Sequence, residues 1–232
     1  MDTLSAIAEE TGINRYTLDM LFFLSCADRM RALYDEKGVD ESIYWASLSD
    51  LKYKLIECKK LHGVYGSFTK NWFPRFLRAE AFALGRLQYE TKPFPMEAYG
   101  DLLKQGDVVC NCHIPSSGAL LGEDVLESLK MAYDFYPQYR RNGILPITCN
   151  SWLLDEDLKE FLPETSNIIR FGNLFTKVYA KELNCLLSSI FKDDTTEENL
   201  ADAVCTSSFA AKVKEAVLGG KMFHMTLGFI PK

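Results

Sequence analysis

A thiol, an amide, a hydroxyl and an indole follow one another where a short apolar run ends. The run Ile144–Thr148 is followed by Cys149, Asn150, Ser151 and Trp152. On an extended strand, the side chains of Cys149 and Ser151 project from one side, and those of Asn150 and Trp152 project from the other. A thiol or a hydroxyl in this position is a candidate nucleophile if a neighbouring base activates it.

His113 is the candidate base. It lies near the end of a predicted strand over Asp107–Pro115, and the ordinary pKa of an imidazole suits proton transfer near neutral pH. With Cys149, or with Ser151 and Asp155, it would form a hydrolytic dyad or triad. The glycines of a G-x-S-x-G nucleophile elbow are absent, and a free cysteine is more often a buried structural residue. The sequence therefore offers a Ser- or Cys-dependent hydrolase only as an alternative.

The cysteines do not form a metal-binding pattern. Cys110 and Cys112 are two positions apart on the predicted strand, and the chain has no second pair of cysteines or histidines at zinc-ligand spacing. The seven cysteines are an odd number, in a chain large enough to fold without disulfide bonds. We therefore predict free thiols, no metal site and a cytoplasmic protein.

The elements that must position these residues fall into two groups. Apolar residues recur at helical spacing over 14–34, 40–61 and 68–81, so the first third of the chain is predicted to be helical. Alternation typical of strands then appears at 85–90, 107–115, 144–152, 184–191 and 222–230, with helices at 123–136, 156–162 and 209–218. Asp155 is the expected N-cap of the helix at 156–162. This order predicts an α/β (α+β) fold, with a helical N-terminal part packed on a mixed sheet with flanking helices.

Composition limits the classes of partner. The 232 residues are 47% apolar and 25% charged, which is typical of soluble globular proteins. The net charge of −6 gives no basic surface for nucleic acid or an anionic membrane. The apolar run Met20–Leu24 is far shorter than the roughly 18 residues of a membrane span. We expect a small-molecule substrate and no nucleic-acid or membrane partner.

Five segments occur in a characteristic order: GRLQYE, HIP, CNSWLLD, LPETSNIIRF and TSSFAAKVKEAVLGGKMFHMTLGFIP. Together they resemble an acyltransferase-like family that joins a helical N-acyltransferase N-terminal domain to a GNAT-like C-terminal domain. The resemblance implies a domain boundary between 1–80 and 81–232, with a GNAT-like sheet in the second part. The family often has histidine at the position of Asn150, so this chain departs from the pattern there.

The resemblance implies transfer of an acyl group from acetyl-CoA or another acyl-CoA to a small amine. GNAT enzymes hold the cofactor pyrophosphate on backbone amides of a strand-to-helix turn, where helix N-terminal amides meet an anion. The equivalent residues here are Ile114, Ser116, Ser117 and Gly118. The loop lacks the Arg or Gln that opens the usual Arg/Gln-x-x-Gly-x-Gly/Ala pattern. Two acidic residues at 123 and 124 also occupy the first turn of the following helix, where they would repel an anion.

The same resemblance suggests where the acceptor amine would bind. Arg86, Gln88 and Glu90 share one face of a predicted strand, and in a GNAT-like sheet such a face can line the acceptor cleft. His113 or Glu90 would deprotonate the amine, while Arg86, Gln88, Asn150 and Trp152 would contact the substrate. A GNAT-like protein that has lost catalysis but still binds a small ligand is the principal alternative.

Overall fold

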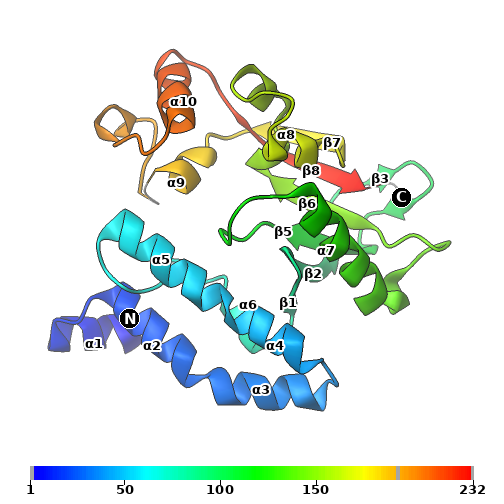
Figure 1. Cartoon of the computed structure of the whole chain (residues 1–232), viewed down its shortest axis with the longest axis horizontal. Helices are drawn as coiled ribbons and strands as arrows, with labels where there is room; N and C mark the ends of the chain where they lie inside the picture. Colours follow the sequence, from blue (N-terminus) through cyan, green and yellow to red (C-terminus); the bar gives the residue numbers. More distant parts are fainter. Residues whose placement is uncertain (1–2, 192–193, 231–232) are drawn as a thin grey trace. The chain divides into compact units, whose positions relative to one another are not determined.

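Helices occupy the first third of the chain, and strands mixed with helices follow them, as the sequence predicts (Figure 1). The computed structural model describes residues 3–191 and 194–230. Six of the described strands form one sheet in the order β1-β2-β5-β6-β8-β7, and β3 pairs with β4. The predicted fold class, α/β with a mixed sheet and flanking helices, is confirmed. The strands are β1 (Ala81–Leu84), β2 (Leu87–Pro93), β3 (Ala98–Tyr99), β4 (Leu103–Lys104), β5 (Val108–His113), β6 (Ile147–Ser151), β7 (Thr176–Glu182) and β8 (His224–Ile230).

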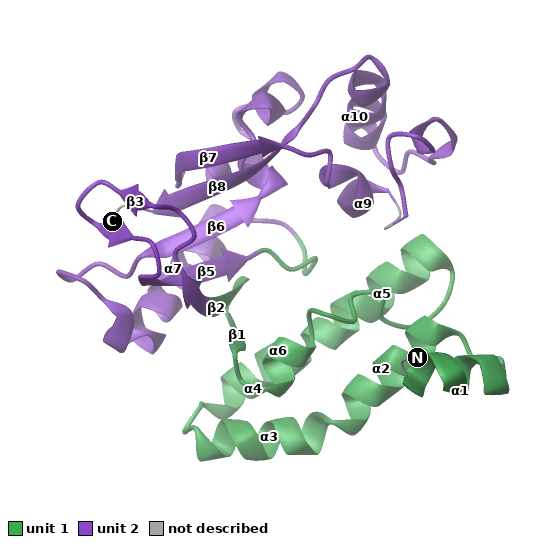
Figure 2. Ribbon diagram, turned by 180° about the vertical axis from the view of Figure 1, so that it is seen from behind, with its two compact units in different colours: residues 1–90, 114–118 green, residues 91–113, 119–232 purple. Residues whose placement is uncertain are grey.

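The chain divides into two compact units, which Figure 2 shows in different colours. The first comprises Met1–Glu90 and Ile114–Gly118, and the second comprises Thr91–His113 and Ala119–Lys232. Within residues 3–191 and 194–230, no helix combines the length and the apolar composition that crossing a membrane requires. The helices of the first unit are α1 (Thr3–Thr11), α2 (Arg15–Ser25), α3 (Ala27–Glu36), α4 (Glu41–Leu48), α5 (Asp50–His62) and α6 (Pro74–Leu77).

Local capping sets the helix starts in the first unit. The side chains of Asn14 and Asp40 accept hydrogen bonds from backbone N–H groups two residues further on, and they cap α2 and α4. The prediction of one helix over 14–34 is wrong, because the chain tightens at Cys26, whose N–H bonds to the Phe23 carbonyl at 3.1 Å. The helix predicted over 40–61 is likewise interrupted at Ser49, so four shorter helices replace the two predicted ones.

A tight hairpin joins β1 to β2. Leu84 pairs with Leu87, so Gly85 and Arg86 form a two-residue turn in which Gly85 has a φ of +67°. Strand β1 is buried along its whole length and was not predicted. The helix predicted over 68–81 is wrong except for α6, which begins at a proline that favours a helix start.

The second unit contains a β-α-β arrangement. Strands β5 and β6 are parallel, with Asn111 opposite Thr148, and α7 (Gly122–Phe135) connects them and runs along one face of the sheet (Figure 1). Strand β8 pairs antiparallel with both β6 and β7. The carboxyl ends of β5 and β6 therefore lie at the same edge of the sheet as the start of β8, the edge where α/β sheets commonly bind ligands.

An apolar cluster in this unit joins three helices, α8 (Asn167–Gly172), α9 (Leu186–Ile190) and α10 (Ser208–Leu218). The strand predicted over 184–191 is wrong, because α9 occupies that segment. Its apolar residues recur at 186, 187, 190 and 191, a spacing that puts them on one helical face toward the cluster. Tertiary packing thus selects the helix over the strand.

Candidate active site

Three polar side chains on β5 and β6 form a hydrogen-bonded series that ends at His113, the last residue of β5. The Thr148 hydroxyl donates to Asn111 Oδ1 at 3.1 Å, and Asn111 Nδ2 lies 2.9 Å from His113 Nε2. Thr148 and Asn111 are buried, whereas His113, the last residue of β5, is half-buried. A buried polar network therefore supports the imidazole of His113 at the carboxyl end of β5.

This series also determines where the neutral His113 ring carries its proton. The Asn111 oxygen accepts from Thr148, so the amide nitrogen is the group that faces His113 and donates to Nε2. The neutral imidazole then holds its own proton on Nδ1. His113 can take up a second proton at Nε2 when the Asn111 amide releases that nitrogen. Asn111 is thus placed to orient the ring.

The sheet separates the predicted candidates by face. The hydrogen bonds through Asn111 show that Thr148 and His113 project from the same face of the sheet. Successive residues of a strand project from alternate faces. Asn150 therefore projects from the His113 face, and it is exposed. Cys149 and Ser151 project from the opposite face, where Cys149 is fully buried.

Neither predicted nucleophile has an activated environment. A hydrogen bond to Cys149, together with burial, raises the pKa of the neighbouring Cys112 thiol. Ser151 Oγ accepts from the Leu153 N–H at 3.1 Å and so caps a short 3-10 helix, η2 (Trp152–Leu154). Both groups have structural partners, and the dyad or triad that the sequence allows with His113 is not assembled.

Trp152, a predicted substrate contact, packs in the apolar cluster of the second unit. Its ring stacks on Phe209 of α10, with ring centroids 6.4 Å apart and planes inclined by 17°. This contact joins η2 to α10. We therefore interpret Trp152 as a residue that positions the end of β6.

The predicted cofactor loop follows β5 directly. Ser116 and Gly118 are exposed, while Ile114 and Ser117 are half-buried. Gly118 has a φ of +118°, a conformation that favours glycine, and a Cβ built on it would meet no atom within 4 Å. The loop therefore leaves open space beside its backbone at Gly118, as a bound phosphate group would require.

The three candidates from the predicted strand face contact different partners within the first unit. Arg86 lies in the β1–β2 turn and donates to two carbonyl oxygens of the loop Ile114–Gly118. Gln88 is buried and donates to Asp50 Oδ1 at 2.7 Å. The third candidate, Glu90, forms an ion pair with the Arg75 guanidinium at 3.2 Å. Each side chain is thus held by another part of the fold.

Asp50, which the sequence did not single out, is a buried carboxyl at the start of α5. Its Oδ2 has no hydrogen-bond partner among the described residues. Burial raises the pKa of this carboxyl above its ordinary 3.8, against the opposing effects of Lys54 and Gln88. The folded protein therefore binds this proton more tightly than the unfolded chain does.

We expect Asp50→Asn to remove a pH-dependent loss of stability. Because the folded-state pKa is raised, the contribution of this carboxyl to stability is most favourable below the ordinary value of 3.8 and becomes less favourable as pH rises from there through the folded-state value. The slope in that window is about 1.4 kcal/mol per pH unit. Urea unfolding at a series of pH values measures it, with the exposed Asp28→Asn as control. Parallel wild-type and Asp50→Asn curves would contradict the assignment.

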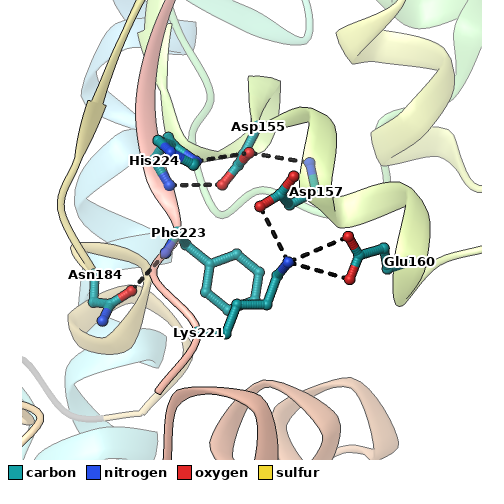
Figure 3. A network of polar contacts seen from close by, with 7 residues as sticks. All are labelled: Asp155, Asp157, Glu160, Asn184, Lys221, Phe223 and His224. Atoms are coloured by element: carbon teal, nitrogen blue, oxygen red, sulfur yellow. Dashed lines mark hydrogen bonds and ion pairs between the residues drawn. The ribbon is translucent and has the colours of Figure 1, made fainter. Parts of the chain in front are cut away.

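An acid–histidine pair at the start of β8 was not predicted (Figure 3). Asp155 accepts from the backbone N–H of His224 at 2.6 Å and lies 3.3 Å from its Nδ1. As predicted, Asp155 also caps the following 3-10 helix, η3 (Glu156–Glu160), through the N–H of Asp157. Asp155, Asp157 and His224 offer ligand atoms within 4.8 Å of one another. Lys221, 3.1 Å from the Asp157 carboxylate, already supplies a positive charge there, and the group ties β8 to the end of β6.

Comparison with known families identifies the second part of the chain. Residues 81–230 match the family model described as the GNAT-like C-terminal domain. The chain belongs to this family. Residues 2–79 of this GNAT-like protein match the N-acyltransferase N-terminal domain. No curated protein matches the chain.

Solved structures of acyltransferases have the same fold. One, in complex with decanoyl-CoA and teicoplanin, is 24% identical and has a TM-score of 0.78, over 95% of this chain and 68% of that one. Another, in complex with CoA and 10C-teicoplanin, has a TM-score of 0.79 at the same identity and coverage. At this identity the likeness establishes that this GNAT-like protein has an acyltransferase fold.

Proposed function

We propose that this GNAT-like protein is an acyltransferase that moves an acyl group from acyl-CoA to a small amine. The observation that carries the proposal is the match to acyltransferase structures over 95% of the chain, with a TM-score of 0.78. Family matches to both an N-acyltransferase domain and a GNAT-like domain support it. The neighbouring acyltransferases were crystallised with decanoyl-CoA, octanoyl-CoA or CoA, which supports the same class of donor here.

The loop after β5 is the proposed binding site for the diphosphate of the donor. Ile114, Ser116, Ser117 and Gly118 would contribute backbone N–H groups, for which the open space at Gly118 leaves room. The acidic residues at 123 and 124 lie in the first turn of α7 and weaken the attraction for an anion. We therefore expect a modest affinity that falls as ionic strength falls, because salt screens this repulsion.

His113 is the proposed acid–base residue. The neutral amine attacks the thioester carbonyl carbon, so that a C–N bond forms and the C–S bond breaks. His113 takes the proton that the amine loses and returns it to the departing thiolate, which balances the reaction. Asn150, exposed on the same face, is the proposed substrate contact. Glu90 is the alternative base, although its ion pair with Arg75 must open first.

The seven cysteines, none of which is in a disulfide bond in the described residues, suit a reducing compartment, and we propose the cytoplasm as the location. A reduced thiol pool also matches the release of free coenzyme A. Cys149 and Ser151 have no part in this mechanism, because both lie on the opposite face of the sheet from His113.

Ligand-dependent stability tests the donor assignment. Acetyl-, octanoyl- and decanoyl-CoA would each be added at increasing concentration while the melting temperature is measured. A donor at 100 times its dissociation constant should stabilise the native state by about 2.7 kcal/mol. An unchanged melting temperature with every donor would reject the proposed function. A shift without any turnover would instead favour the second candidate, a non-catalytic ligand-binding protein.

A further inference from the structure

The guanidinium group of Arg86 holds the loop Ile114–Gly118 at two points. Its Nη1 donates to the Pro115 carbonyl at 3.1 Å, and its Nη2 donates to the Gly118 carbonyl at 2.6 Å. All these groups belong to the first compact unit. A planar guanidinium offers several donors in a fixed fork, so the two carbonyl groups are held at a set separation. Two carbonyl oxygens of the loop therefore accept hydrogen bonds from the same guanidinium group, which fixes the conformation of the turn.

A second contact restrains the same loop. The Ser116 hydroxyl donates to Glu57 Oε2 at 3.1 Å, and Lys54 Nζ lies 2.9 Å from that carboxylate oxygen. Lys54 and Glu57 are three residues apart on α5, where side chains at this spacing are neighbours. Lys54 therefore offsets the negative charge that Glu57 would otherwise bring next to the loop.

The loop carbonyls are bound, but its amides are not. Among the described residues, no acceptor forms a hydrogen bond with the backbone N–H groups of Ser116, Ser117 and Gly118. Consecutive unpaired N–H groups in a turn are an anion-binding arrangement. The loop has no arginine or glutamine of its own to attract an anion, as the sequence shows. Arg86 brings a positive charge to the loop from the β1–β2 turn.

We propose that Arg86 is a positioning residue for the diphosphate of acyl-CoA. Arg86 lies in the β1–β2 turn and supplies the positive charge that the loop itself lacks. It also fixes the loop in the conformation in which the amides of Ser116–Gly118 can bind the anion. The inference rests on the proposed function, since it takes acyl-CoA as the donor. It predicts that Arg86 affects donors that carry a diphosphate and does not affect donors without one.

Calorimetric titration with two ligands tests this prediction. CoA carries the diphosphate, and pantetheine has the same thiol arm without it. We expect Arg86→Gln to weaken CoA binding about tenfold, which is typical of losing charge-assisted hydrogen bonds, and to leave pantetheine binding unchanged. Arg86→Lys keeps the charge but cannot form the two-point fork, so its effect should be intermediate. Arg78→Gln, which removes the same charge from an exposed pair with Glu80, is the matched control and should change neither ligand.

The outcomes separate the two proposals. If the wild type binds neither ligand nor any acyl-CoA, the proposed function fails and the role of Arg86 fails with it. If the wild type binds CoA and Arg86→Gln does not weaken it, only the role of Arg86 is rejected. An equal loss for CoA and pantetheine would mean that Arg86 merely supports folding, which also overturns the proposal. Thermal unfolding of each variant verifies that the native state is populated.

Discussion

His113→Ala is expected to lower kcat for acyl transfer by about 10²- to 10⁴-fold, the usual contribution of a positioned acid–base group. The dissociation constant for acyl-CoA should stay within about twofold, because the proposed donor contacts come from the loop backbone. Steady-state kinetics with separate binding measurements distinguish the two effects. The substitution should also lower the free energy of unfolding by about 1–3 kcal/mol, because the amide of the buried Asn111 loses its acceptor at His113 Nε2.

A glutamine at the same position sharpens this test. His113→Gln keeps a polar side chain beside Asn111 but cannot titrate between pH 5 and 8. If the ring acts as a base, kcat/KM of the wild type falls at acidic pH, and this acidic limb should be absent in His113→Gln. Cys149→Ala is the control, because Cys149 lies on the other face of the sheet. A kcat for His113→Ala within about threefold of the wild type would exclude the acid–base role.

Asp155→Ala should destabilise the protein by about 3 kcal/mol. The change removes an N-cap, worth about 1 kcal/mol, and leaves the part-buried N–H of His224 without its acceptor, at a cost of about 1–3 kcal/mol. The Asp155 side chain is only 4% exposed, so water cannot replace it easily. Chemical denaturation followed by circular dichroism measures the difference.

Asp157→Ala is the matched control for this prediction. Asp157 is 35% exposed, and its side chain pairs with Lys221 at the surface, so its loss should cost under about 1 kcal/mol. The backbone N–H of residue 157, which donates a hydrogen bond to Asp155, is retained in this variant. Equal effects of the two substitutions would show that Asp155 is not the link between β8 and the end of β6.

Features that depend on neighbouring residues could be predicted from the sequence. Asp155 was expected to cap a helix because an N-cap needs only its own side chain and the next few amides. Strands β5, β6 and β8 were expected because buried apolar alternation is a local pattern. Edge strand β7 was missed because its residues are mostly exposed on both faces, which removes the alternation.

Features that depend on strand register or distant contacts could not be predicted. The sequence shows that Cys149 and Asn150 project from opposite faces of their strand. Only the pairing of Asn111 with Thr148 reveals which of the two shares a face of the sheet with His113. Asp155 and His224 are 69 positions apart, so no spacing rule connects them. Arg86 likewise reaches the loop from a hairpin turn 29 to 32 positions earlier.

Product analysis tests the central claim, acyl transfer from acyl-CoA to an amine, most directly. The protein would be incubated with octanoyl-CoA and a mixture of small primary amines, and the products separated by liquid chromatography with mass detection. We predict that free CoA and one N-acyl amide appear in equal amounts, and that both are lost in His113→Ala. Release of CoA with only the free acid would indicate hydrolysis, and bound acyl-CoA that stays intact would indicate a binding protein. Either result would contradict the proposed transferase.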